Sequence, residues 1–176
     1  VMGSDLAGIV VETGSSVTRF RVGDAVYASL FDMDKGSLSE YVAVPESVAA
    51  LKPESLSFTE AASIPMVALT AWQAFERAHV RAGQKVFIPA GSGGIGTFAI
   101  QLARHLGASV ATTTSTGNTG MAKSLGVQHI IDYKSQSFEK ILSDYDLVLG
   151  TQRGDVIEKV LQLLNHCWHP GSLAFS

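Results

Sequence analysis

Residues 85–96 read Lys-Val-Phe-Ile-Pro-Ala-Gly-Ser-Gly-Gly-Ile-Gly, and this stretch decides the fold of the chain. An apolar run, Val86–Ile88, leads into a loop with glycines at positions 91, 93 and 96. A helical pattern follows at once, with one apolar face made of Ile95, Phe98, Ala99, Leu102, Ala103 and Leu106. A strand, a G-x-G-x-x-G turn and a helix in this order indicate a site for the pyrophosphate of a dinucleotide.

Each glycine of this loop has a separate predicted role. Gly91 permits the tight turn, Gly93 lets backbone N–H groups approach the phosphates, and Gly96 lets the helix pack closely on its strand. The phosphates would then lie at a helix N-terminus, where unpaired N–H groups and the helix dipole favour negative charge. Ser92, Gly94 and Ile95 complete the predicted phosphate-binding loop. The alternative is an ordinary strand-to-helix turn without a ligand.

The rest of the chain after residue 85 alternates between strand and helix patterns. We expect strands at 85–89, 109–114, 129–133, 146–150 and 171–176. Helices are expected between them, at 94–106, 118–125, 136–143 and 154–164. This alternation predicts an α/β fold, a doubly wound parallel Rossmann sheet with helices on both faces. A complete domain of this kind has six strands, so the five visible here predict a domain that is incomplete at its C-terminus.

The first part of the chain is rich in short strand patterns separated by turns. Strands are expected at Ile9–Val11, Ala25–Leu30 and Leu38–Val44, which favours an antiparallel β unit. Residues 1–56 are therefore assigned to a partial β domain and residues 57–176 to the dinucleotide-binding domain.

Two helices are expected at the junction of these domains. Ser57 and Glu60 have the spacing of a capping box that opens a helix over 58–63. Pro65 is expected to interrupt it, and a longer helix is predicted over 68–79.

Composition excludes several classes of function. The chain has 176 residues, of which 46% are hydrophobic and 16% charged, with a net charge of −3. This is a globular composition with no basic footprint for nucleic acid or a membrane surface, and no apolar run reaches the ~18 residues of a membrane span. The single cysteine, Cys167, excludes an internal disulfide framework. We expect no signal peptide and a cytoplasmic location.

Several further motifs carry a family resemblance over essentially the whole chain. The sequence resembles the zinc-independent quinone oxidoreductase branch of the medium-chain dehydrogenases/reductases. Besides the glycine loop, the resemblance rests on Gly3-Ser-Asp-Leu-Ala-Gly8, Val22-Gly-Asp-Ala-Val-Tyr27, Ala61-Ala-Ser-Ile-Pro65, Leu69-Thr-Ala-Trp-Gln73 and Ile130-Ile-Asp-Tyr133. It implies a GroES-like β domain before the Rossmann domain, with the active site in the cleft between them. It also implies NADPH-dependent reduction of a small molecule, a quinone or an α,β-unsaturated carbonyl, and a homodimer of the full-length protein.

The resemblance also allows a test for zinc. Alcohol dehydrogenases of the superfamily have a histidine ligand where this chain has Ser4, and a cysteine ligand where it has Met66. Because neither residue is a good zinc ligand, we expect no catalytic metal. The alternative cluster His166-Cys-Trp-His169 lacks a second ligand pair at a suitable spacing.

The choice of nucleotide depends on the end of the second strand of the Rossmann domain. NAD enzymes have an Asp or Glu there for the ribose hydroxyls, whereas residues 111–118 contain no carboxylate. Thr114, Ser115 and Asn118 could donate hydrogen bonds to the 2′-phosphate of NADPH, although Asn118 stands where many relatives have a basic residue. Alternatively these hydroxyls are only β-branched strand formers and cofactor use is mixed.

Two further contacts come from the resemblance alone. Thr70 matches a threonine near the nicotinamide, and Tyr133 matches a tyrosine near the adenosine-side phosphate. Each also has a purely structural alternative, as a buried helix residue and as a half-exposed residue at a strand end. Phe175 and Ser176 fall where the fifth strand delivers backbone to the nicotinamide.

No catalytic residue identifies itself. Asp5 and Tyr41 are candidates by residue type, but the simpler interpretation is a structural carboxylate for Asp5 and a strand aromatic in the β core for Tyr41. The turns at 150–154 and 166–172 depart from the family pattern, and the first lies beside the expected nicotinamide site. Two alternatives stay open. One is an enoyl reductase of polyketide or fatty-acid assembly, which shares these motifs, and the other is a non-catalytic NADPH-binding protein, which the 150–154 turn alone favours.

Overall fold

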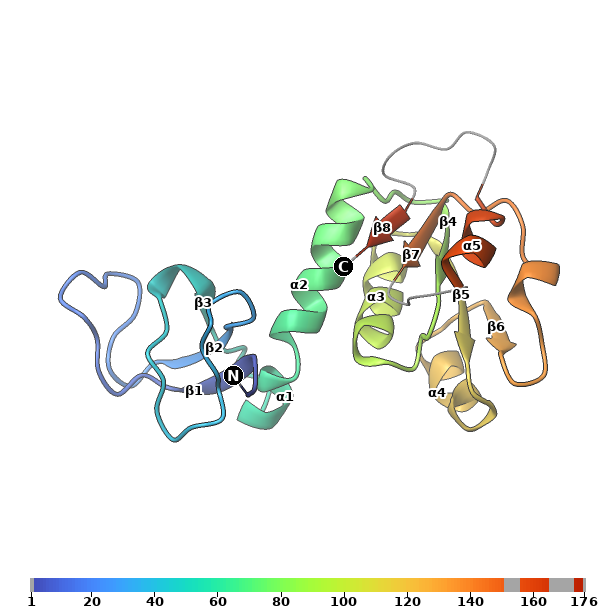
Figure 1. The fold of residues 1–176 in the computed structure, drawn as a ribbon. Coiled ribbons are helices and arrows are strands. Elements are labelled where there is room, and N and C mark those ends of the chain that lie inside the picture. Colours follow the sequence, from blue (N-terminus) through green and yellow to red (C-terminus); the bar gives the residue numbers. More distant parts are fainter. Residues whose placement is uncertain (1, 151–155, 165–172, 176) are drawn as a thin grey trace. The chain divides into compact units, whose positions relative to one another are not determined.

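The computed structural model describes residues 2–150, 156–164 and 173–175. The chain divides into two compact units, Val1–Val67 and Ala68–Ser176 (Figure 1). The assignment of residues 57–176 to one functional domain stays a prediction, although contacts within the chain group residues 57–67 with the first unit. Among the described residues, no helix is both long enough and apolar enough to span a membrane.

The first unit contains a three-stranded antiparallel sheet. Its strands are β1 (Asp5–Ile9), β2 (Ala25–Ser29) and β3 (Ala49–Leu51), in the order β1-β2-β3. β1 and β2 form a hairpin in which Asp5 pairs with Ser29 and Ile9 with Ala25. A 3₁₀ turn, η1 (Glu46–Val48), leads into β3, a strand that the sequence pattern missed.

Two strand predictions in this unit are wrong. The strand expected at Ile9–Val11 lies earlier, at Asp5–Ile9, because polar Asp5 and small Gly8 hide its pattern. The segment Leu38–Val44 forms no strand, and Leu38 and Tyr41 are three-quarters exposed. A strand needs a partner for its backbone groups, and no described strand pairs with this segment. The interpretation of Tyr41 as an aromatic of the β core is wrong for the same reason.

The two predicted helices are present with shifted bounds. α1 (Phe58–Ala62) begins at the predicted capping box, in which the Ser57 hydroxyl accepts from the Glu60 amide and the Glu60 carboxylate accepts from the Ser57 amide. α2 extends from Pro65 to Arg77. Pro65 is thus the first residue of the second helix, where a missing N–H has no helical partner to lose, and not an interruption before a later start.

The second unit is built on a five-stranded parallel sheet. Its strands are β4 (Lys85–Ile88), β5 (Ser109–Thr114), β6 (His129–Asp132), β7 (Leu147–Gly150) and β8 (Leu173–Phe175). The sheet order is β6-β5-β4-β7-β8, with every adjacent pair parallel. The chain starts in the middle, moves outward to β6 and then returns to the other side of β4. This reversal between β4 and β7 is the switch point of the Rossmann fold, where ligands bind at the carboxyl ends of the strands.

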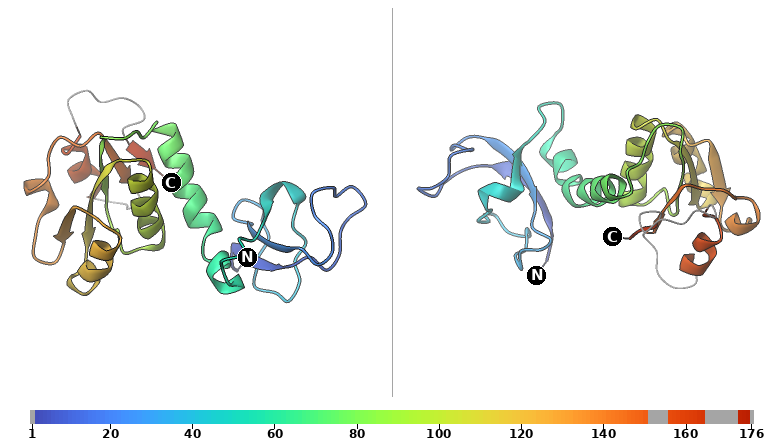
Figure 2. Two further views of the ribbon diagram at one scale, coloured as in Figure 1. Left: turned by 180° about the vertical axis from the view of Figure 1, so that it is seen from behind. Right: turned by 90° about the horizontal axis from the view of Figure 1, so that it is seen from above.

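Helices cover both faces of this sheet. α3 (Gly94–His105) and α4 (Thr119–Ser124) pack on one face, where Val86 and Ile88 of β4 join a core with α3 residues Ala99 and Ile100. Phe87, between those two strand residues, points to the opposite face and packs in a second core that contains Val160 of α5 (Val156–Leu161). Figure 2 shows α3 and α5 on opposite sides of the sheet. The alternation is what a strand buried on both faces requires.

One helix prediction in the second unit is wrong. The segment 136–143 forms only the single 3₁₀ turn η3 (Phe138–Lys140). Phe138 and Leu142, four residues apart, pack in the second core, and the Leu142 amide donates to the Phe138 carbonyl over 2.9 Å. Asp144 then takes a left-handed conformation with φ 60°, which ends the turn. One turn is enough to bury both apolar residues, so the periodicity predicted more helix than forms.

Candidate functional site

Three described segments meet the carboxyl edge of the parallel sheet, one after each of three neighbouring strands. The glycine loop follows β4, the 3₁₀ turn η2 (Thr116–Asn118) follows β5, and Tyr133 follows β6. The segment directly after β7 starts at residue 151 and lies outside the described residues. Of the two turns that depart from the family pattern, only Gly150 of the first is therefore described, as the last residue of β7.

Hydrogen bonds from β5 hold the start of the glycine loop. The Ala90 amide donates to the Thr113 hydroxyl over 3.0 Å, and the Gly91 amide donates to the Thr113 carbonyl over 3.0 Å. The loop then turns back on itself, since the Gly93 amide donates to the Ala90 carbonyl over 2.9 Å. Ala90 has a left-handed φ of 54°, a conformation that costs a residue with a Cβ about 1–2 kcal/mol.

Two of the three motif glycines are required by the protein's own packing. A Cβ on Gly91 would lie 2.0 Å from the Thr112 hydroxyl and 2.9 Å from Cδ1 of Ile100. A Cβ on Gly96 would lie 2.4 Å from the Ala90 carbonyl oxygen and 2.7 Å from Cα of Gly91. Both residues are buried, and both glycines let α3 close onto β4 and β5.

Gly93 differs from both. It is exposed, and a Cβ there would meet only the Ala90 carbonyl oxygen, at 3.3 Å. Its φ of −80° and ψ of 168° suit any residue. The fold therefore gives little reason for a glycine at this position, whereas a group approaching from outside the loop gives one.

The N-terminus of α3 begins at this open position. Gly93 is the N-cap and supplies no side-chain hydrogen bond to the first turn. The first N–H groups of a helix have no partner within it, and here they follow the exposed glycines Gly93 and Gly94. Ser92 and Ile95 are half-buried, and Ile95 packs on the first core. This geometry fits an anionic group with several oxygen acceptors, such as a pyrophosphate.

The three threonines of β5 are buried, and the hydroxyls of two of them have hydrogen-bond partners. The Thr112 hydroxyl donates to the Ile88 carbonyl, and Thr113 holds the glycine loop. Thr114 is fully buried, and its hydroxyl has no hydrogen-bond partner among the described residues. Direct contact between Thr114 and a phosphate would require this edge to open, and its predicted role stays a prediction.

The η2 turn carries the other two candidate phosphate donors. Ser115 is half-buried and Asn118 is exposed, and the Asn118 amide donates to the Ser115 carbonyl over 2.9 Å. The Thr116 hydroxyl between them donates to Oδ2 of Asp132, the last residue of β6. This hydroxyl bond, followed by one from the Lys134 amide, lowers the pKa of Asp132 below its usual value.

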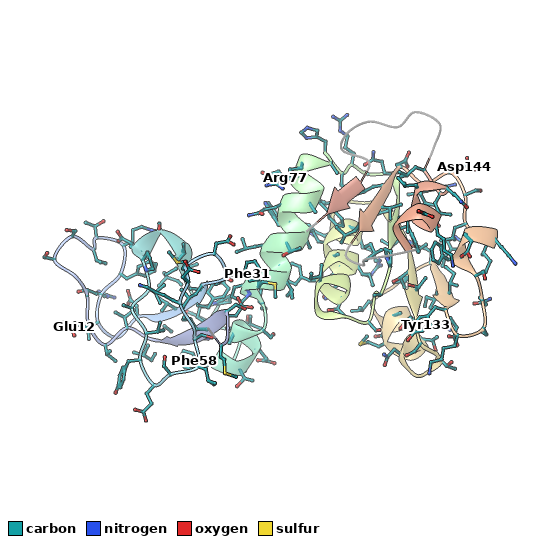
Figure 3. The ribbon with its side chains drawn as sticks, in the orientation of Figure 1. Glu12, Phe31, Phe58, Arg77, Tyr133 and Asp144 are labelled. Carbon is teal, nitrogen blue, oxygen red and sulfur yellow. The ribbon has the colours of Figure 1, made fainter. Side chains whose placement is uncertain are left out.

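The two residues carried over from the family resemblance are placed as follows. Tyr133 is 59% exposed and follows β6 (Figure 3), within reach of solvent on the same edge as η2. Thr70 is half-buried in α2, next to Ala71, which packs in the first core with residues of β4 and α3. Their contacts with a cofactor stay predictions.

Met66, one of the two positions compared with zinc ligands, is bonded to Asp5, the residue after the other position, Ser4. Oδ1 of Asp5 accepts from the Met66 amide over 3.2 Å, which gives Asp5 a structural partner. In the part of the chain that the structure describes, no three His, Cys, Asp or Glu side chains gather as a metal site would require. His166, Cys167 and His169 lie outside that part.

Sequence reasoning missed three residues that shape this edge. Thr113 and Ala90 hold the glycine loop, and Asp132 holds η2. Thr113 stood within a predicted strand and Asp132 within a family landmark, but neither received a role. The available signal was their position at the carboxyl ends of β5 and β6, where side chains reach the loops of neighbouring strands.

Comparison with known families agrees with both units. Residues 1–54 match the alcohol dehydrogenase GroES-like domain, and residues 94–166 match the family described as zinc-binding dehydrogenase. The first match contains the antiparallel sheet of the first unit, and the second begins at Gly94, the first residue of α3 and part of the glycine loop.

Individual relatives are oxidoreductases. The chain is 43% identical over 171 residues to 2-methylene-furan-3-one reductase of Solanum lycopersicum, covering 92% of this chain and 44% of the relative. It is 40% identical over 156 residues to the chloroplastic NADPH-dependent alkenal/one oxidoreductase of Arabidopsis thaliana, covering 84% of this chain and 40% of the relative. The chain thus spans less than half the length of these relatives.

A solved structure gives the same result for the fold. The quinone oxidoreductase from Coxiella burnetii superposes with a TM-score of 0.88 at 37% sequence identity, over 93% of this chain and 52% of that one.

Proposed function

Because the chain belongs to the medium-chain dehydrogenase/reductase superfamily, among its quinone oxidoreductase-type members, we propose that it binds NADPH and belongs to a reductase of α,β-unsaturated carbonyls or quinones. The observation that carries this proposal is the exposed Gly93 at the N-terminus of α3. A Cβ is excluded at Gly91 and Gly96 by the protein itself, whereas at Gly93 it would meet one carbonyl oxygen at 3.3 Å, so the fold alone gives little reason for a glycine there.

The residues of the glycine loop have defined tasks in this proposal. The first amides of α3 bind the pyrophosphate, and Thr113 holds the loop that presents them. Gly91 and Gly96 keep α3 close to the sheet, so that its N-terminus stays aimed at the phosphates. When bound, NADPH supplies a hydride from C4 of its nicotinamide.

NADPH is preferred to NADH in this proposal because of the η2 turn. Residues 111–118 contain no carboxylate, so nothing on this turn repels a 2′-phosphate, and Ser115 and Asn118 can donate to it. The alkenal/one oxidoreductase relative carries NADPH in its name, which supports the same choice.

The substrate is proposed from the relatives, two of which are named for unsaturated carbonyl compounds. Hydride addition to the β-carbon of an enone places negative charge on its carbonyl oxygen, which hydrogen-bond donors can stabilise without a metal.

Zinc independence is part of this proposal, because Ser4 and Met66 are poor ligands. We assign no catalytic residue, since Asp5 is bonded to the Met66 amide and Tyr41 lies in an irregular exposed segment. A cytoplasmic location and a homodimer also stay predictions.

The test is made on the full-length protein, titrated with NADPH and NADH while its thermal stability is followed. A ligand at ~100 times its Kd adds about 2.7 kcal/mol to the free energy of unfolding. We expect stabilisation by NADPH, with little by NADH, and a clear reduction of both in Gly93→Ala. Equal stabilisation by both nucleotides would overturn the NADPH preference, and no stabilisation by either would overturn the cofactor proposal.

Turnover then separates the three functional alternatives. NADPH consumption is followed with an enone, with a quinone and with an enoyl thioester. Consumption with the first two supports the proposal. Activity confined to the thioester favours the enoyl reductase, and binding without any turnover favours a non-catalytic NADPH-binding protein.

A further inference from the structure

We propose that Asp132 is a positioning residue for cofactor selectivity, which holds the η2 turn through Thr116 so that Ser115 and Asn118 face the 2′-phosphate of NADPH. This inference rests on the proposed function and deepens it. In this proposal Asp132, a residue of β6, contacts neither the pyrophosphate nor the 2′-phosphate of NADPH. It acts through η2, the turn after β5.

The carboxylate of Asp132 joins two segments of the edge. Its Oδ2 accepts from the Thr116 hydroxyl, and its Oδ1 accepts from the Lys134 amide over 3.0 Å. The Asp132 amide in turn donates to Oε1 of Gln136 over 3.1 Å. One side chain therefore fixes η2 on one side and the turn that begins with Tyr133 on the other.

The register of β5 with β6 places the end of β5, which leads into η2, beside Asp132 at the end of β6. Asp132 pairs with Thr114 across β5 and β6, and the Tyr133 amide donates to the Thr114 carbonyl over 3.2 Å. The last residues of the two strands are thus locked side by side, and Thr116 needs to turn back by only two residues to meet the carboxylate. The hydrogen bond between Thr116 and Asp132 therefore depends on the register of β5 with β6.

The conformation of η2 supports the role of Thr116 as its anchor. The Asn118 amide donates to the Ser115 carbonyl over 2.9 Å, and the Thr119 hydroxyl donates to the Thr116 carbonyl over 2.9 Å. These bonds define the shape of the turn, but the Thr116–Asp132 bond is the side-chain contact that ties this shape to β6. This bond is also the largest cause of the lowered pKa of Asp132.

The same bond gives the carboxylate a partner that is not the cofactor. In NAD-selective enzymes a carboxylate at this edge accepts from the ribose hydroxyls. Both oxygens of Asp132 instead accept from the protein. Removal of the Thr116 hydroxyl would leave Oδ2 free to accept from a ribose diol, and would release the turn that holds Ser115 and Asn118 toward a 2′-phosphate. Loss of the contact should therefore change selectivity and not only affinity.

The test compares Thr116→Val with Thr116→Ser in the full-length protein. The measured quantity is the ratio of the Kd for NADH to the Kd for NADPH. We expect Thr116→Val to lower this ratio at least fivefold, whereas Thr116→Ser keeps the hydroxyl and the wild-type ratio. Asp132→Ala should also lower the ratio, and Asp132→Asn, which retains an acceptor, should lower it less. Ser135→Ala is the matched control, since its hydroxyl bonds the Asp132 carbonyl and not the carboxylate.

A second readout needs no cofactor. Hydrogen exchange at the Asn118 and Thr119 amides should accelerate in Thr116→Val but not in Thr116→Ser. An unchanged ratio in Thr116→Val, or an equal loss of both affinities, would overturn the inference while leaving the proposed function intact. Wild-type protein that binds neither nucleotide would overturn both, and the exchange data alone would then show whether the turn is anchored.

Discussion

The glycine loop and the η2 turn lie at the ends of neighbouring strands but are held in different ways. The glycine loop is bonded to Thr113 but is also restrained by packing, because Gly91 and Gly96 lie where a Cβ would strike backbone or core atoms. In η2 the restraint is polar, because Thr116 reaches a carboxylate on the next strand. Glycines of the η2 region show the contrast, since a Cβ on Gly117 or Gly120 would meet no atom within 4 Å.

The two segments should differ in how well they tolerate substitutions. A loop fixed by packing tolerates few substitutions, and those it rejects destabilise the whole unit. A turn fixed by exposed hydrogen bonds can change at low cost to stability. In the proposed function, the pyrophosphate of the cofactor would therefore meet a loop that tolerates few substitutions, and its adenosine a turn that tolerates more.

The largest effect is expected for Gly96→Ala. Its Cβ would lie 2.4 Å from one backbone atom and 2.7 Å from another, and backbone atoms cannot move aside as side chains can. Overpacking of this kind should lower the free energy of unfolding by about 3 kcal/mol. Urea denaturation without nucleotide measures it. Gly120→Ala, in open space within α4, is the control and should not lower stability. Equal stability of the Gly96 variant and the wild type would mean that packing does not restrain the glycine loop.

Gly93→Ala should separate binding from folding. The Ala90 carbonyl oxygen, at 3.3 Å, has only to shift by a few tenths of an ångström, so the urea midpoint should stay near that of the wild type. A methyl group over the loop should displace a phosphate from at least one N–H, and a hydrogen bond to a charged group contributes about 1.5–3 kcal/mol. The Kd for both NADPH and NADH should therefore rise about tenfold or more, as titration calorimetry can measure. If the variant binds both nucleotides normally, the open space at Gly93 is not a phosphate site.

The two regions also differ in how far the sequence predicts them. The bounds of β5 and the start of α3 were predicted correctly, because a buried strand, a glycine turn and an amphipathic helix are local patterns. The Thr116–Asp132 contact could not be predicted in this way. Its partners are sixteen residues apart and meet only through the register of β5 with β6.

The wrong predictions have the same origin. Segment 38–44 has the alternation of a strand, but no described strand offers it a partner. Segment 136–143 has helical spacing at Phe138 and Leu142, but the second core accepts both from a single turn. The left-handed Ala90 had no sequence signal at all, since alanine rarely adopts that conformation.

Ala90 offers a smaller test of the packing-held loop. Its φ of 54° disfavours any residue with a Cβ, at a cost of about 1–2 kcal/mol. Glycine loses about 0.5–1 kcal/mol through its greater freedom in the unfolded chain. Ala90→Gly should therefore raise the free energy of unfolding slightly, whereas Ala82→Gly, exposed and without a positive φ, should lower it. Urea denaturation of the two variants should shift their midpoints in opposite directions. A loss of stability in Ala90→Gly would instead mean that the methyl group of Ala90 packs favourably.

The smallest expected effect is a change in the pKa of Asp132, the residue that is bonded to η2. The Thr116 hydroxyl holds the pKa of Asp132 below its usual value, so the contact stabilises the folded state above the unfolded-state pKa of about 4 and is lost as the pH falls through the lowered folded value. In Thr116→Val the pKa of Asp132 should rise toward the usual value, as carbon-detected NMR of the carboxyl group can measure. Glu60, whose pKa is lowered by its Ser57 capping bonds in the other unit, serves as the internal control and should not move. An unchanged pKa of Asp132 in the variant would mean that the hydroxyl does not hold the carboxylate in solution, and η2 would then need another anchor.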